Sequence, residues 1–327
     1  MNANLRQKFV IGLGLGLAVF LGMILYGDVQ AVGRLLQTFH WRLIPLILGL
    51  TTINYLLRGL RFHYYLRQIG ITQISFADSL RVFIGGFSLT ITPGKIGELI
   101  RVLWLKNITG ADPAQTAPAT IVDRIADGLA MALLALLGAL IYPQYQLAVL
   151  SILGIILLLV SISQIRPLAL WLLRLGEQLP LLRRFAHHLH TLYDSTYTLL
   201  RLKNLALGVG IGLISWSAEG LAFYTVLVGL GLLPSVNLAL LAIFMLALGS
   251  ILGGASSLPG GLGAAEASLT GALQLLVNLP EPTAVTATLL IRFFTLWFAV
   301  SLGLLTVAFW RKKLFGKEKT YPVFRTA

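Results

Sequence analysis

The sequence Thr92-Pro93-Gly94-Lys95-Ile96-Gly97-Glu98 decides the fold expected for this chain, and Leu258-Pro259-Gly260-Gly261-Leu262-Gly263 repeats its pattern. Both stretches read Pro-Gly-x-(Ile/Leu)-Gly, and both lie inside apolar sequence. A proline followed by glycines ends one helix and lets the next begin at a sharp angle. At membrane depth such a break is tolerated only where it lines a protein cavity or a wet site. We therefore predict that the two breaks face each other and form the functional site.

The composition is that of a membrane protein. Hydrophobic residues make up 57% of the 327 residues and charged residues only 11%, whereas a soluble domain carries about 25% charge. The formal net charge is +13. Most Lys and Arg fall in or beside loops expected on one side of a bilayer, so they indicate topology rather than nucleic-acid binding. The chain has no cysteine, which excludes disulfide and thiolate chemistry.

Apolar runs of about 20 residues predict six full membrane spans. We place them at residues 9–26, 41–60, 118–141, 147–162, 206–230 and 284–309. Shorter apolar pieces lie on either side of each proline and predict two re-entrant helical hairpins, over residues 76–106 and 238–277. The predicted fold class is an all-α polytopic membrane protein, with residues 1–327 as a single integral membrane domain.

Residues 166–203 interrupt the apolar pattern. Apolar residues recur there every three to four positions with Arg and His between them, which predicts an amphipathic cytoplasmic helix on the membrane surface. We interpret His187, His188 and His190 as a solvated basic face, because no carboxylate or cysteine lies nearby at metal-ligand spacing. The basic tail, residues 311–327, should lie on the same side, which makes both termini cytoplasmic. The second span ends in residues typical of a membrane interface: Arg58, Arg61, His63, Tyr64, Tyr65 and Arg67.

The two halves of the chain, residues 41–141 and 206–310, match in three blocks. Residues 53–62 match 214–223, residues 93–97 match 259–263, and residues 119–124 match 287–292. In the predicted topology the halves are inverted, and inverted repeats with broken helices are typical of carriers that work by alternating access. The alternative is chance similarity among apolar segments.

Charged residues inside the predicted membrane segments are the candidate site residues, because a charge at the bilayer centre costs about 3 kcal/mol. Positive helix ends at the two breaks favour an anion such as a phosphate or phosphodiester. Two carboxylates four residues apart, Asp123 and Asp127, resist ionising together, which suits proton or cation exchange. The residues expected to bind substrate are Lys95, Arg101, Arg124, Arg292, Gly94, Gly97, Gly260, Gly261 and Gly263. Those expected to couple protons or form structural ion pairs are Glu98, Asp123, Asp127, Glu219, Glu266 and Arg58.

At these residues the chain resembles the lysylphosphatidylglycerol synthase transmembrane family, also called flippase-like domain proteins. The resemblance is carried by residues 92–101, by Asp123-Arg124-x-x-Asp127-Gly128 and by residues 258–266, and it covers nearly the whole chain. It implies movement of an aminoacylated phospholipid across the bilayer after a separate soluble domain makes it, or a role in polyprenyl-linked sugar pathways. About 18 residues follow the last predicted span, so we expect the soluble aminoacyltransferase domain to be absent.

We therefore expect a flippase or scramblase of the cell inner membrane that moves a lipid with an anionic headgroup through a midplane cavity between the hairpins. The sequence contains no evident Ser-His-Asp set, metal motif or nucleotide loop, so we expect neither enzymatic activity nor a cofactor nor a metal. The six tryptophans, Trp216 among them, are expected to anchor or pack. Two alternatives stay open: a secondary transporter of a small soluble anion, and an enzyme that modifies a lipid phosphate.

Overall fold

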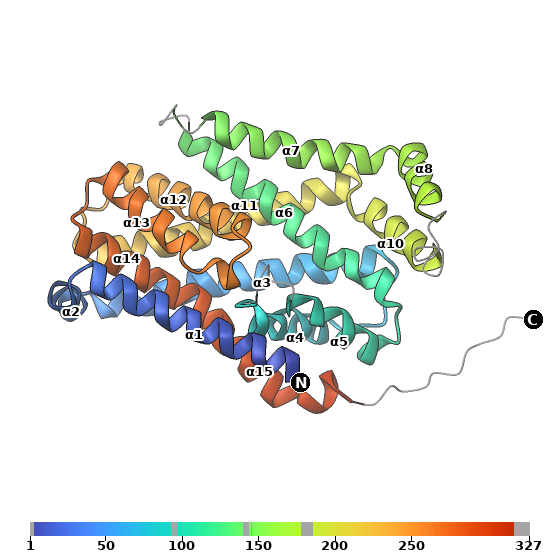
Figure 1. Cartoon of the computed structure of the whole chain (residues 1–327), viewed down its shortest axis with the longest axis horizontal. Coiled ribbons are helices and arrows are strands. Elements are labelled where there is room, and N and C mark those ends of the chain that lie inside the picture. Colours follow the sequence, from blue (N-terminus) through green and yellow to red (C-terminus); the bar gives the residue numbers. More distant parts are fainter. Residues whose placement is uncertain (1–2, 93–96, 140–143, 145, 178–185, 317–327) are drawn as a thin grey trace, which may run out of the picture.

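The computed structural model describes residues 3–92, 97–139, 144, 146–177 and 186–316. Across these residues the chain is helical and no strand is found, which confirms the predicted all-α class. Five helices are long and apolar enough to cross a membrane, and α1 with α2 forms a sixth candidate that is bent by 96°. The helices drawn in Figure 1 are α1 (Ala3–Tyr26), α2 (Val29–Thr38), α3 (Ile44–Gln68), α4 (Phe76–Gly86), α5 (Ile100–Thr109), α6 (Pro113–Ala139), α7 (Gln146–Gln164), α8 (Arg166–Glu177), α10 (Ala186–Leu199), α11 (Leu202–Gly229), α12 (Val236–Ala255), α13 (Ala264–Val277), α14 (Glu281–Arg292) and α15 (Phe298–Leu314).

The candidate spans differ from the predicted ones at two helices. α12 has 20 residues and counts among the spans, although the sequence indicated only a hairpin arm there. α6 does not count, because Asp123, Arg124 and Asp127 interrupt its apolar sequence. Its 27 residues nevertheless pack against α3, α5, α7, α11 and α12. Asp123 and Asp127 are therefore enclosed by protein, whereas the side chain of Arg124 is 30% exposed.

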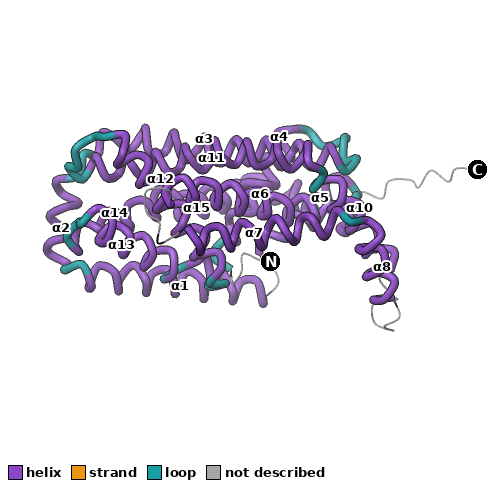
Figure 2. The backbone as a smooth tube through the Cα atoms, turned by 90° about the horizontal axis from the view of Figure 1, so that it is seen from above, coloured by secondary structure: helices purple, strands orange, loops and turns teal. Residues whose placement is uncertain are grey.

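The segment over residues 166–203, predicted as an amphipathic helix, has residues 178–185 outside the described part of the chain. The structure has two helices there, α8 and α10, and α8 projects from one end of the molecule (Figure 2). α10 packs on α6 and buries Tyr193 and Leu199. Its apolar residues therefore cover the protein rather than only a membrane surface.

The two helices that carry the first matched blocks, α3 and α11, pack side by side along the molecule (Figures 1 and 2). Asn54 on α3 donates a hydrogen bond from Nδ2 to the backbone oxygen of Ser215 on α11, at 2.9 Å. Asn54 and Ser215 occupy equivalent positions in the two blocks. The halves of the chain thus meet through residues that the sequence comparison paired.

Each Pro-Gly break lies between two helices that pack against each other, α4 with α5 and α12 with α13. The two pairs extend toward opposite ends of the molecule (Figure 1). This arrangement is what two hairpins require. Their re-entrant position in a bilayer and the inversion of the repeat stay predictions, because both depend on where the membrane lies.

The second break depends on glycine at Gly261, in the short 3-10 turn Pro259–Gly261. Gly261 has a φ of 68°, and an added Cβ would lie 3.0 Å from the backbone of Gly253 on α12. A side chain there would be strained both by its own backbone and by its neighbour.

We expect Gly261→Ala to lower the free energy of unfolding by about 1–3 kcal/mol, because it imposes a strained backbone conformation. The measurement is thermal unfolding of the detergent-purified protein by tryptophan fluorescence. Gly210→Ala on α11 is the control, since a Cβ at Gly210 meets no atom within 4 Å. Equal stability of the two variants would show that the turn tolerates a side chain.

Candidate functional site

The described parts of the two Pro-Gly breaks are in contact. A Cβ built on Gly260 would lie 3.5 Å from the Cα of Ile91, which precedes the first break. Residues 93–96, with Gly94 and Lys95 among them, lie outside the described residues. The amide of Gly97, on the far side of that stretch, donates to Oγ1 of Thr92 at 2.8 Å. Thr92 and Gly97, which flank the first break, are therefore in contact with each other.

A central cavity of about 500 Å³ lies at this contact and is lined by both halves of the chain. Leu99 and Ile121 line it and are 40% and 41% exposed, and the cavity is open rather than enclosed, so part of its opening is apolar. Ile152 and Ile156 of α7 complete this apolar wall. The charged residues that line the cavity are Arg58, Glu98, Arg124, Asp127, Glu219 and Arg292.

The two halves contribute equivalent arginine–glutamate ion pairs to this region. Arg124 Nη2 lies 2.6 Å from Glu98 Oε2, and Arg292 Nε lies 2.5 Å from Glu266 Oε1. The partners are 26 residues apart in both pairs, and each glutamate follows a Pro-Gly break. This equivalence supports the internal repeat, because chance similarity among apolar segments does not create matching ion pairs.

Glu266 occupies the N-terminus of α13, where the sequence led us to expect an external anion. Its Oε2 accepts a hydrogen bond from the amide of Gly263 at 2.6 Å. Arg292, its ion-pair partner, also donates from Nη2 to the carbonyl oxygen of Gly260 at 3.0 Å. The carboxylate therefore satisfies the positive helix end and the guanidinium together. Glu266 is thus an internal anion at the helix end where an external one was expected.

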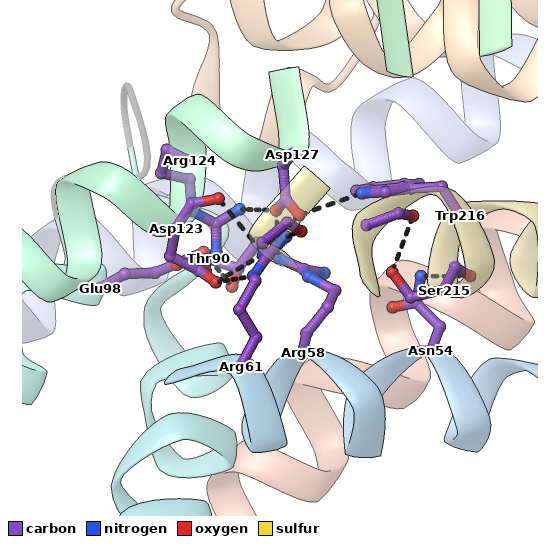
Figure 3. Close-up of polar contacts among 12 residues, drawn as sticks. Asn54, Arg58, Arg61, Thr90, Glu98, Asp123, Arg124, Asp127, Ser215 and Trp216 are labelled. Atoms are coloured by element: carbon purple, nitrogen blue, oxygen red, sulfur yellow. Dashed lines mark hydrogen bonds and ion pairs between the residues drawn. The ribbon is translucent and has the colours of Figure 1, made fainter. Parts of the chain in front are cut away.

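Four buried charges form a network between α3 and α6, which we call the α3–α6 charge network: Arg58, Arg61, Asp123 and Asp127 (Figure 3). Arg61 donates from Nε to Asp123 Oδ1 at 2.9 Å and from Nη2 to Asp127 Oδ1 at 2.6 Å. Arg58 Nη2 lies 2.8 Å from Asp127 Oδ2. The two guanidinium groups offset the repulsion between the carboxylates. The compensated carboxylates of Asp123 and Asp127 therefore do not favour proton exchange, and we interpret the network as a structural link between α3 and α6.

The interpretation of Arg61 as an interfacial residue is wrong, since its side chain is 0% exposed. A sequence signal for its role existed. Arg58 and Arg61 are three residues apart, and Asp123 and Asp127 are four apart. Each pair therefore lies on one face of its helix, as two complementary stripes.

Arg101, predicted to bind substrate, does not line the central cavity. Its side chain is 0% exposed, and its guanidinium lies 4.4 Å from the ring centre of Phe83 and 5.6 Å from that of Phe87. Its Nη2 lies 3.2 Å from Glu98. Arg101 therefore pairs with Glu98 from a position outside the cavity, and aromatic rings enclose its guanidinium. We assign it a supporting role.

Sequence reasoning missed several cavity residues. Trp216, expected only to anchor or pack, lines the cavity and donates from Nε1 to Asp127 Oδ1 at 3.1 Å. It precedes Glu219 by three residues, and this spacing on a helix was the available signal. Tyr55 also lines the cavity, and its hydroxyl donates to the carbonyl oxygen of Thr295 at 2.7 Å. Thr295 lies in the π-helix Phe293–Trp297, a departure from α geometry that the sequence did not reveal.

The other predicted site residues divide between this cavity and a second one. Gly260 and Gly261 line the central cavity, whereas Gly263 and Glu266 line the second, which lies between α1 and α13. Asp123 and Gly97 line neither. Both members of the Arg124–Glu98 pair thus line the central cavity, whereas the Arg292–Glu266 pair is divided between the two cavities.

A multi-pass helical membrane protein with a charged internal cavity is the class that the fold and site define. Comparison with known families gives the relationship: residues 10–303 match the model described as the lysylphosphatidylglycerol synthase TM region. The chain belongs to this family, as the motifs in its sequence indicated. It is also 26% identical over 325 residues to a protein of Methanothermobacter thermautotrophicus described as a UPF0104 membrane protein, and the match covers 94% of this chain and 95% of that protein.

Proposed function

We propose that this protein is a lipid flippase or scramblase that moves a phosphate-bearing lipid, a phospholipid or a polyprenyl-phosphate-linked lipid, through the central cavity. The observation that carries the proposal is the composition of that cavity. Charged groups of both halves meet there, while part of its opening, at Leu99 and Ile121, is apolar. One ligand satisfies both features, a molecule with an anionic headgroup and a hydrocarbon tail.

The headgroup would bind at the two arginines that face the cavity. The side chains of Arg124 and Arg292 are 30% and 14% exposed, and the nearest carboxylate to each is a glutamate. Arg124 also lies 3.6 Å from Asp127 and 3.8 Å from Asp123. A phosphate accepts two parallel hydrogen bonds from a guanidinium, as a carboxylate does. When the headgroup binds, its phosphate would replace the glutamate carboxylate at the arginine, so the guanidinium stays paired with an anion.

The tail would stay in the lipid beside α7. This helix is apolar along its length, and most of its residues are exposed on the outside of the protein. A tail that leaves the cavity past Ile152 and Ile156 meets only hydrocarbon side chains. A carrier of a small soluble anion has no need for such an opening, which is why we favour a lipid over that alternative.

We place the protein in the cell inner membrane with both termini in the cytoplasm. The support is the asymmetry of positive charge between the loops, with basic segments at residues 166–203 and 311–327.

The test of the proposed function is translocation in proteoliposomes that contain trace amounts of headgroup-labelled phosphatidylglycerol. We expect the label to become accessible to a membrane-impermeant quencher in both leaflets only when the protein is present. Labelled glucosylceramide, which has a polar headgroup but no phosphate, is the matched substrate control and should move slowly.

Three outcomes would contradict the proposal. Equal movement of both lipids would remove the role of the phosphate. Uptake of radioactive inorganic phosphate without lipid movement would favour the soluble-anion carrier. Chemical conversion of the labelled lipid would favour an enzyme.

A further inference from the structure

A second cavity of about 350 Å³ lies between α1 and α13. Residues of α1 form one side of it: Val19, Gly22, Met23 and Tyr26. Residues of the second break and α13 form the other side: Gly263, Glu266, Ala267, Thr270, Gly271 and Gln274. Nothing in the proposed headgroup site uses this space.

The α13 side of the second cavity is a polar stripe inside a membrane protein. Glu266, Thr270 and Gln274 follow one another at intervals of four residues, so they lie on one face of the helix. The stripe is about 12 Å long, from eight residues at 1.5 Å each. Small residues beside it leave room, and an added Cβ at Gly271 meets no atom within 4 Å. A polar stripe with open space beside it favours water over hydrocarbon.

The cavity opens to the surface along Gly22, Tyr26 and Ala267, and Tyr26, which ends α1 next to α2, is 56% exposed. Figure 1 shows α2 at the end of the molecule opposite α8 and α10. In the predicted orientation this is the external side. The inner end of the cavity is Glu266, whose carboxylate is 1% exposed.

The ion pair between Glu266 and Arg292 forms the wall between the two cavities. Arg292 lines the central cavity and Glu266 lines the second one. Among the described residues of the elements packed around Glu266, α12 and the turn Pro259–Gly261 carry no titratable group. The titratable residues of α14 are Arg292 and, at the far end of the helix, Glu281. On α1 the titratable residues with described side chains include Tyr26. Among the described residues, Glu266 therefore forms its ion pair with Arg292, and Arg292 faces the central cavity.

We infer that the second cavity is a water-filled proton path from one membrane face to Glu266, and that Glu266 takes up one proton when a substrate anion displaces it from Arg292. The inference rests on the proposed function and identifies the proton as the ion whose movement is coupled to that of the lipid. In this step the Glu266–Arg292 ion pair breaks, an ion pair between the substrate anion and Arg292 forms, and the Glu266 carboxylate becomes a carboxylic acid. The entering negative charge is balanced by the entering proton.

The physical reason is the cost of a buried charge without a partner. A carboxylate that loses its guanidinium and stays away from water costs several kcal/mol, whereas the neutral acid avoids that cost. The amide of Gln274 can hold water along the path, and the hydroxyl of Thr270, which donates to Thr288 Oγ1 at 3.1 Å, can still accept a hydrogen bond. The central cavity does not need to supply the proton, so substrate and proton reach the ion pair from different sides.

The first test asks whether the second cavity holds water, and it does not depend on transport. Because the chain has no cysteine, single-cysteine variants can be labelled with a charged, membrane-impermeant thiol reagent. We expect Ala267→Cys and Gly271→Cys to react about ten-fold faster or more than Ser268→Cys, because a hydrated thiol ionises more readily to the thiolate that attacks the reagent. Ser268 lies at the depth of Ala267 but lines neither cavity. Equal rates, or labelling only by a lipid-soluble reagent, would overturn the proton path.

The second test asks whether protons drive the lipid. In vesicles with uniformly oriented protein and headgroup-labelled phosphatidylglycerol, one proton per lipid predicts that a gradient of one pH unit shifts the distribution between leaflets about ten-fold. The double variant Thr270→Val, Gln274→Leu should slow the approach to this distribution. Movement of lipid with no response to the gradient would overturn the coupling and leave the flippase intact. Absence of any movement by the parent would overturn the proposed function itself.

Discussion

Arg61→Ala is expected to be the most destabilising substitution considered for this protein, with a loss of about 3–5 kcal/mol in the free energy of unfolding. Arg61 is fully buried and holds both Asp123 and Asp127. Its removal leaves Asp123 as a buried carboxylate without its guanidinium partner. A domain is stable by only about 5–15 kcal/mol, so most of the margin would be lost. Thermal unfolding in detergent, followed by tryptophan fluorescence, measures the effect.

Two controls separate the buried network from charge in general. The double variant Arg61→Met, Asp123→Asn removes both partners and should recover much of the loss, because a neutral pair leaves no uncompensated charge. Arg81→Ala breaks an ion pair with Asp78 in which the arginine is 32% exposed, and it should cost about 1 kcal/mol or less. A parent-like Arg61→Ala variant would mean that the α3–α6 charge network does not hold these helices together.

Arg292→Ala and Arg124→Ala are expected to give the largest losses of transport. Each removes the guanidinium that would pair with the headgroup, and truncation of such a charge costs about 2–5 kcal/mol in binding. This corresponds to about a 30-fold loss of apparent lipid affinity or more. The measurement is the translocation rate of headgroup-labelled phosphatidylglycerol as a function of its mole fraction in the vesicles.

The lysine variants show whether the shape of the guanidinium matters. Arg292→Lys and Arg124→Lys keep the charge but lose the two parallel hydrogen bonds, so they should retain intermediate activity. Arg101→Lys, at a position away from the cavity, should change stability more than lipid affinity. If both alanine variants move lipid as fast as the parent does, the arginines are structural and the headgroup binds elsewhere.

Much of the arrangement was predictable because membrane burial makes sequence informative. Pro259 and its glycines marked a break that the structure confirms, with positive φ angles at Gly260, Gly261 and Gly263. Arg124 and Arg292 were identified as equivalent from the repeat alone, and both now line the same cavity. These features depend on local sequence, on backbone chemistry and on the cost of charge in lipid.

The missed features depend on which helix packs against which. In the sequence Arg61 resembles an interfacial arginine, and only the packing of α6 against α3 shows that it is buried. Arg101 was identified as a membrane cation, but only its neighbours Phe83 and Phe87 show that it is enclosed by rings. The role of Glu266 as an internal anion also required the fold, since it depends on a hydrogen bond to Gly263 and an ion pair with Arg292.

The most direct test of the central claim is an experimental structure of the protein purified with its native membrane lipids. We predict phosphate density in the central cavity, with oxygens about 3 Å from the guanidinium of Arg124 or Arg292. We also predict density for the hydrocarbon tail that runs from the cavity past α7 into the lipid. Lipid density confined to the outer surface, with both arginines still paired to Glu98 and Glu266 and the cavity filled by water alone, would contradict the central claim.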